Sequence, residues 1–141
     1  MPPVRRATAR STLSPIPPRF MLIYEVNLTV DGDAATRYST WLREHIREML
    51  EVDGFEAAVW FDRYEDGEAV PEDGEPTDPR EWTVHYQVRD REALDAYFDE
   101  HADEMRREGV EKFGDHVESS RRIFEQKRLF QGRRKEDTGP L

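Results

Sequence analysis

The residues best suited to acid–base chemistry are a histidine and a glutamate in the middle of two alternating segments. His85 lies within residues 81–89 and Glu25 within residues 21–30. A nearby carboxylate raises the pKa of an imidazole, and such a histidine can act as a general base or hold a ligand near neutral pH. His85, Glu25 and the neighbouring Tyr86 are therefore candidate catalytic residues. The structural alternative is that His85 is a hydrogen-bonded histidine in a dimer interface.

The two segments alternate as strands with one buried face do. In residues 21–30 the apolar side chains recur at every second position. In residues 81–89 the polar residues Thr83, His85 and Gln87 also occupy every second position. Successive strand side chains point to opposite faces, so these polar groups share a face. Residues 55–63 offer Trp60 or Phe61 to that face, and the last strand offers Arg121 or Arg122. The candidate ligand-binding residues are Asn27, Trp60, Thr83, Gln87, Arg121 and Arg122.

The elements that must position these residues follow the order strand, helix, strand, strand, helix, strand. Apolar residues at helical spacing predict the two helices, and Asp90 is a candidate N-cap for the second. This order predicts an α+β, ferredoxin-like βαββαβ fold, with two helices on one face of a four-stranded antiparallel sheet. The expected strands are 21–30, 55–63, 81–89 and 119–129, the expected helices are 35–54 and 90–109, and 64–79 is an acidic loop.

This topology leaves the second face of the sheet without helices. The simplest way to cover it is a homodimer whose two sheets face each other and enclose a polar cleft. We expect a small polar or anionic molecule to bind in this cleft. Two alternatives stay open: a cofactor-free enzyme, isomerase-like or monooxygenase-like, that uses His85, and a non-catalytic dimerisation module.

Composition excludes several other classes. The chain has 141 residues, no cysteine and a net charge of −10. This charge repels nucleic acids and anionic membranes, and the absence of cysteine excludes disulfides and thiolate metal sites. No apolar run reaches the length of a membrane span or signal peptide, so we expect a cytoplasmic protein. Acidic residues are abundant, and arginine far outnumbers lysine. This composition suits a protein in a salt-rich cytoplasm, or it reflects codon bias.

The charge also divides the chain into three parts. Residues 1–20 hold four arginines, five prolines and no acid, so we expect a disordered basic leader, or a start codon assigned too early. Residues 21–130 hold 14 basic and 29 acidic residues and form the expected domain. Residues 131–141 are expected to be a disordered polar tail.

Metal and cofactor sites are not expected. The pairs His45/Glu48 and His101/Glu104 place a histidine and a carboxylate on one helix face, but a solvated face explains them better than a dimetal site. Acidic residues occupy some of the ligand positions of a calcium-binding loop in this segment, but Tyr64 occupies a position that needs a ligand oxygen. RNA-recognition modules need aromatic residues and basic charge on the open face, where this chain has polar residues and negative charge.

Several segments resemble a known bacterial family. They are the strand MLIYEVNLTV at 21–30, the helix segments WLREHI at 41–46 and YFDEHA at 97–102, and KFGD at 112–115 followed by Arg121 and Arg122. Over residues 21–129 the chain resembles the family called domain of unknown function 4286, which is grouped with the dimeric α/β-barrel proteins. The resemblance implies a ferredoxin-like dimer, and it implies no established activity or catalytic residue.

Overall fold

The computed structural model describes residues 21–65 and 78–133. Residues 1–20, most of the acidic loop at 64–79 and most of the tail at 131–141 lie outside the described residues. The helices and strands all belong to one compact unit, Met21–Glu125. Residues 126–133 follow it without helix or strand, so the last strand ends earlier than the expected residue 129.

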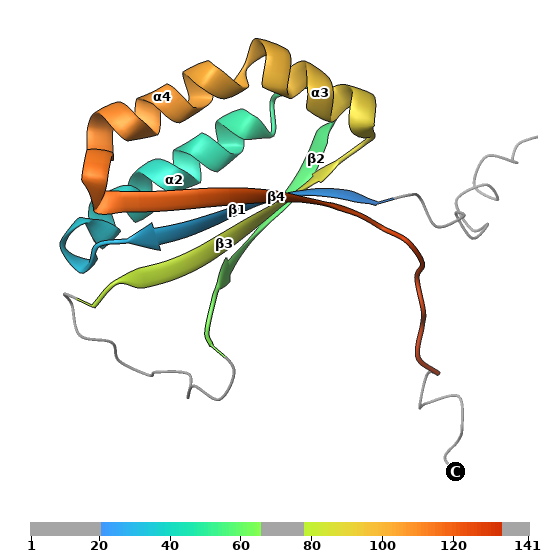
Figure 1. Ribbon diagram of the computed structural model, residues 1–141, viewed down its shortest axis with the longest axis horizontal. Helices are drawn as coiled ribbons and strands as arrows, with labels where there is room; N and C mark the ends of the chain where they lie inside the picture. The colour runs from blue at the N-terminus through green and yellow to red at the C-terminus, as the bar shows by residue number, and fades with distance from the viewer. Residues whose placement is uncertain (1–20, 66–77, 134–141) are drawn as a thin grey trace, which may run out of the picture. The chain divides into compact units, whose positions relative to one another are not determined.

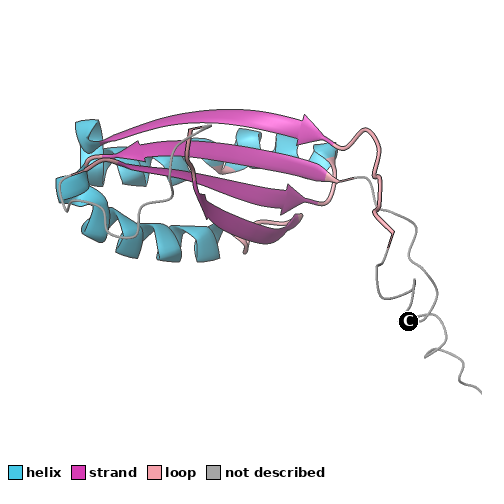
Figure 2. Ribbon diagram, turned by 90° about the horizontal axis from the view of Figure 1, so that it is seen from below, coloured by secondary structure: helices cyan, strands magenta, loops and turns pink. Residues whose placement is uncertain are grey.

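Four antiparallel strands form one sheet with the order β2-β3-β1-β4. The helices cover one face of this sheet (Figures 1 and 2). This arrangement confirms the predicted α+β, ferredoxin-like fold, with β1 and β3 at the centre. The elements are β1 (Leu22–Val30), η1 (Gly32–Ala34), α2 (Ala35–Met49), β2 (Phe55–Asp62), β3 (Arg80–Val88), α3 (Arg91–Glu100), α4 (Ala102–Phe113), η2 (Gly114–His116) and β4 (Val117–Glu125).

The apolar stripes of β1 and β3 pack beneath the helices. Tyr24 pairs with Tyr86 and Leu28 pairs with Trp82 across the two strands, and all four side chains are buried. Because neighbouring residues in a strand point to opposite faces, Glu25 and His85 lie on the other side of the sheet. The hydrophobic core therefore decides which polar groups reach the uncovered face.

The second predicted helix is two helices, α3 and α4, separated at His101, where φ is −128° and ψ is −27°. The Asp90 side chain accepts a hydrogen bond from the Ala93 backbone N–H at 2.9 Å, which confirms the predicted N-cap. The helical segment ends at Gly114, with φ +52°, rather than near Gly109. A Cβ on Gly109 would lie 3.0 Å from the Trp41 ring, so the glycine at this position permits close packing against Trp41.

An irregularity in β2 corrects the expected position of Trp60. Phe55 is buried under the helices, and strict alternation from it would place Trp60 on the uncovered face. The pairing of β2 with β3 instead shifts by one residue between Phe55 and Ala57. This bulge reverses the alternation, so Trp60 packs edge-on against Trp82 on the helix side and Phe61 takes the uncovered face.

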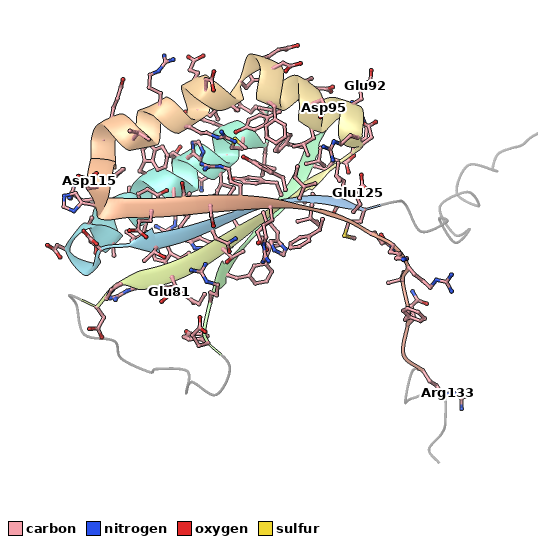
Figure 3. All side chains as sticks on the ribbon, in the orientation of Figure 1. Glu81, Glu92, Asp95, Asp115, Glu125 and Arg133 are labelled. Carbon is pink, nitrogen blue, oxygen red and sulfur yellow. The ribbon has the colours of Figure 1, made fainter. Side chains whose placement is uncertain are left out.

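The helices carry charged side chains on their outer surfaces, as Glu92 and Asp95 on α3 illustrate (Figure 3). Alternating buried and exposed positions are typical of helices that pack against a sheet on one side only. Within the residues that the structure describes, no helix combines the length and apolar character needed to cross a membrane.

Candidate ligand-binding site on the open face of the sheet

The strand register brings most of the predicted site residues together on the face that no helix of the described residues covers, here called the open face. Glu25 on β1 lies directly opposite His85 on β3 and opposite Arg122 on β4, and Asn27 lies opposite Thr83. Side chains directly opposite each other on one face of an antiparallel pair are close enough to interact. We call Glu25, Asn27, Arg63, Thr83, His85 and Arg122 the open-face cluster.

Glu25 is the centre of this cluster and is buried, with 4% of its surface exposed. One carboxylate oxygen, Oε1, lies 2.8 Å from Nε2 of His85. The other, Oε2, accepts hydrogen bonds from Nε of Arg122 at 2.6 Å and from the Asn27 amide at 2.8 Å. Both oxygens of the carboxylate are therefore occupied, and Glu25 acts mainly to orient its neighbours.

These contacts decide the ionisation of Glu25. Burial by itself would raise the pKa of this carboxyl group, but hydrogen bonds from Arg122, Asn27 and His85 and the charge of Arg122 outweigh it. The net result is a pKa below the ordinary value for glutamate. Glu25 is consequently a carboxylate at neutral pH, which suits it to align the His85 ring rather than to donate a proton.

Arg63 ties the far end of the cluster together. Its Nη1 donates to the Thr83 hydroxyl at 3.0 Å, to the Asn27 side-chain oxygen at 3.3 Å and to the Trp82 backbone carbonyl at 2.7 Å. The Thr83 hydroxyl in turn donates to the Asn27 side-chain oxygen at 2.7 Å. The sequence analysis missed Arg63. Residues two positions apart in a strand point to the same face, so the spacing between Phe61 and Arg63 is the signal that could have assigned Arg63 to the open face.

Two aromatic rings border the histidine. The ring centroids of Phe61 and His85 are 5.2 Å apart, and those of His85 and Phe124 are 6.1 Å apart. The Arg122 guanidinium also lies over the Phe124 ring, 5.0 Å from its centroid. Polar groups with neighbouring apolar surface are typical of small-molecule sites, where the polar groups orient the ligand.

Four of the predicted site residues do not join the cluster. Tyr86, Trp60 and Arg121 lie on the helix side of the sheet, because they pair with Tyr24, Val84 and Val26. Tyr86 therefore cannot share a site with His85, its neighbour in the chain. Gln87 is on the open face, but it lies opposite Ile23 at one end of the cluster.

The described domain matches the model of a known protein family. The model of the family described as domain of unknown function (DUF4286) matches residues 21–127. This chain belongs to the DUF4286 family. The match spans all the helices and strands, so the resemblance in the separate sequence segments is confirmed. The family's description assigns no activity, and no curated protein matches the chain.

Two solved structures resemble this DUF4286 member. A dimeric ferredoxin-like protein from an uncultured marine organism has 10% sequence identity and a TM-score of 0.53, and the match covers 78% of this chain and 99% of that one. A de novo designed protein, Foldit4, has 17% identity and a TM-score of 0.46, with 77% of this chain and 99% of that one covered. At such identities, the first of these structures supports the ferredoxin-like fold and nothing finer.

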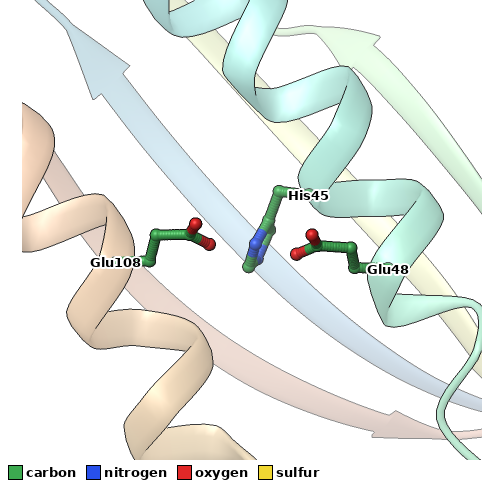
Figure 4. Close-up of side chains that lie close together, drawn as sticks. All are labelled: His45, Glu48 and Glu108. Atoms are coloured by element: carbon green, nitrogen blue, oxygen red, sulfur yellow. The ribbon is translucent and has the colours of Figure 1, made fainter.

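One group of side chains in this DUF4286 member has the composition of a metal site. His45 and Glu48 on α2 approach Glu108 on α4, with candidate ligand atoms within 4.8 Å of one another (Figure 4). Histidine and carboxylate ligands could hold a zinc-like ion. However, both glutamates are exposed, and Arg37 and Lys112 line the same groove, where their positive charges disfavour a bound cation. The third member of this group is Glu108, and neither His101 nor Glu104 belongs to it. A solvated helix face remains our interpretation of both histidine–glutamate pairs.

Proposed function

We propose that this DUF4286 member is a homodimer formed through the open face of its sheet, and that a small polar or anionic molecule binds between the two sheets. Apolar exposure on this face favours the dimer. Val59 is 50% exposed, Phe61 is 42% exposed and Phe124 is 39% exposed. Pairing of like surfaces about a twofold axis would remove all three from water in each copy. The description of the solved neighbour of similar fold as dimeric is consistent with this proposal.

The observation that carries the binding proposal is the way Glu25 holds Arg122. The Glu25 contact uses Nε of Arg122, whose side chain is 64% exposed. In the described part of the chain, no hydrogen bond uses its two terminal nitrogens. An arginine held by one nitrogen still presents two donors in a plane, which match a carboxylate or phosphate. His85 beside it supplies a further ring nitrogen.

The dimer is tested by introducing a charge into the open face. Phe61→Asp should convert a dimer into a monomer, because an unpaired carboxylate would be buried in the interface. Sedimentation velocity measures the mass, and circular dichroism confirms that the fold is retained. Ala96→Asp on α3 is the matched control and should remain dimeric. A monomeric wild-type protein would contradict the proposal, and so would a dimer that Phe61→Asp leaves intact.

Anion binding is tested with malonate and inorganic phosphate as probes. Either anion should shift the NMR resonances of the His85 ring, and Arg122→Gln should weaken this response about tenfold, the equivalent of one charged hydrogen bond. Arg43→Gln removes an exposed arginine from α2 and should change nothing. A dimer whose His85 resonances ignore both anions would instead favour the non-catalytic dimerisation module.

A specific contact favours the cofactor-free enzyme as a second candidate. The 2.8 Å contact between His85 and Glu25 has the form of a general base held by an orienting carboxylate. Under this reading, His85→Ala abolishes turnover of the bound molecule and leaves the dimer intact. If His85→Ala dissociates the dimer, the histidine is structural.

A further inference from the structure

A cavity of about 170 Å³ lies on the opposite side of the sheet from the open-face cluster. Its lining residues come mainly from helices α2 and α4 and from strands β1, β3 and β4. Figure 1 shows both helices on the same side of the sheet. Ser119 and Arg121 on the edge strand β4 are exposed, whereas Tyr24 and Leu42 on its walls are buried, so β4 marks its mouth. Much of the remaining wall is apolar: Val26, Leu28, Leu42, Met49, Val84 and Met105.

The charge of the cavity is opposite to that of the domain around it. Arg106 and Arg121 both line it, and none of the described residues in its wall is acidic. Two arginines in a wall without carboxylates are unusual for a domain with 14 basic and 29 acidic residues, although Asp103 on α4 also acts on the charge of Arg106 from outside this wall. Arg106 is partly buried, and an arginine in such a position normally pairs with an anion, because its desolvation is otherwise uncompensated. Arg121 is exposed and donates to the Ser119 hydroxyl at 3.2 Å.

Two buried polar atoms in side chains of this cavity lack partners. Nε of Arg106 and Nδ1 of His45 are buried, and neither has a hydrogen bond in the described structure. Most buried polar atoms in proteins are paired, and each exception calls for an explanation. The Arg106 guanidinium is held in place, since its Nη2 donates to the Tyr24 hydroxyl at 3.1 Å. The His45 ring is held by stacking on Trp41 at 4.5 Å.

His45 adds a polar atom to the cavity without adding charge. Burial, together with the charge of Arg121, lowers the pKa of His45 to about 4. The imidazole is consequently neutral at physiological pH and can donate one N–H. The fixed positive charge of the cavity comes from its two arginines.

We propose that this cavity binds a small molecule with one carboxylate and an apolar body, its carboxylate held by Arg106, Arg121 and His45. A guanidinium is well matched to a planar carboxylate. The two unpaired atoms are buried in this structure, and small movements of the Arg106 and His45 side chains would let the bound carboxylate accept hydrogen bonds from them. The apolar body would lie against the aliphatic side chains of the wall. This site goes beyond the proposed function, since it lies on the other face of the sheet and needs no second copy.

Benzoate is a suitable probe, and benzamide is its uncharged counterpart of the same shape. Isothermal titration calorimetry of the full chain should detect benzoate binding. Replacing the carboxylate by an amide, or Arg121 by glutamine, should each weaken binding at least about tenfold, the equivalent of one charged hydrogen bond. Arg107→Gln removes an exposed arginine next to Arg106 and should bind as the wild type does. Val26→Phe should fill the cavity and abolish binding in a folded protein.

Four results would overturn this proposal. Benzoate that fails to bind the wild-type chain, or that binds Val26→Phe unchanged, excludes the cavity as its site. Inorganic phosphate that binds as tightly as benzoate contradicts the need for an apolar body. Binding that is lost in Arg122→Gln and kept in Arg121→Gln assigns the carboxylate to the open face, which supports the proposed function at the expense of this second site.

Discussion

Replacing Tyr86 with alanine is expected to lower the free energy of unfolding by about 3–5 kcal/mol, as for other large aromatic residues in a core. Tyr86 is 2% exposed. Its ring centroid lies 6.1 Å from that of Tyr24 and 5.7 Å from that of Phe55. The truncation would remove these contacts from the centre of the helix-covered face, where the surrounding strands and helices cannot close the gap fully. Urea denaturation followed by circular dichroism measures the loss.

Tyr86→Phe distinguishes the contribution of the ring to stability from that of the hydroxyl group. It keeps the packing, so the free energy of unfolding should change by less than about 1 kcal/mol. Burial raises the pKa of the Tyr86 phenol, so the hydroxyl stays neutral and is unsuited to proton transfer at physiological pH. A Tyr86→Ala variant as stable as the wild type would contradict this role in the core. So would a loss of anion response at His85 in a stable Tyr86→Phe protein.

Replacing Glu25 with glutamine is expected to cost about 2 kcal/mol of stability, the size of a charge-assisted hydrogen bond. The side chain keeps its shape but loses its charge, and only one of its two terminal atoms can accept hydrogen bonds, whereas Arg122 and Asn27 contact one carboxylate oxygen of Glu25 and His85 contacts the other. The exposed side chain of Arg122 limits the cost, because its charge stays hydrated when the carboxylate is lost. Denaturant unfolding at neutral pH measures the difference.

The pH dependence of this difference has a definite sign. The pKa of Glu25 in the folded protein is below its ordinary value of 4.5. A carboxyl group with a lowered folded pKa stabilises the protein above its unfolded pKa, and this contribution is lost as the pH falls through the folded pKa. The stability gap between wild type and Glu25→Gln should therefore be largest above pH 4.5 and shrink in more acidic solution.

A second glutamate on the open face provides the control for Glu25→Gln. Glu118 on β4 is exposed and lies opposite Thr29, outside the open-face cluster. Glu118→Gln should change stability by less than about 0.5 kcal/mol, as most surface substitutions do. A stability gap for Glu25→Gln that persists unchanged at low pH would show that the Glu25 charge is not its source.

The alternation in β1 and β3 was enough to predict which of their polar residues share the open face. Apolar residues at every second position face the core whatever the partner strand, so Glu25, Asn27, Thr83 and His85 could be assigned to the open face in advance. The same reasoning predicted the order of elements and the fold. It was weaker in β2 and β4, where two adjacent residues were both plausible: Trp60 or Phe61, and Arg121 or Arg122.

Periodicity and composition in the chain itself determined the fold class, the buried stripes of the central strands and the polar character of the open face. The tertiary structure decided which residues meet: the bulge in β2 exposed Phe61, and the pairing of β4 with β1 put Arg122 beside Glu25 and Arg121 at the mouth of the cavity. Local patterns report which side of an element is apolar. Strand register and the space left between helices and sheet depend on contacts between distant residues, and for this reason the cavity with Arg106 and His45 had no signal in the sequence.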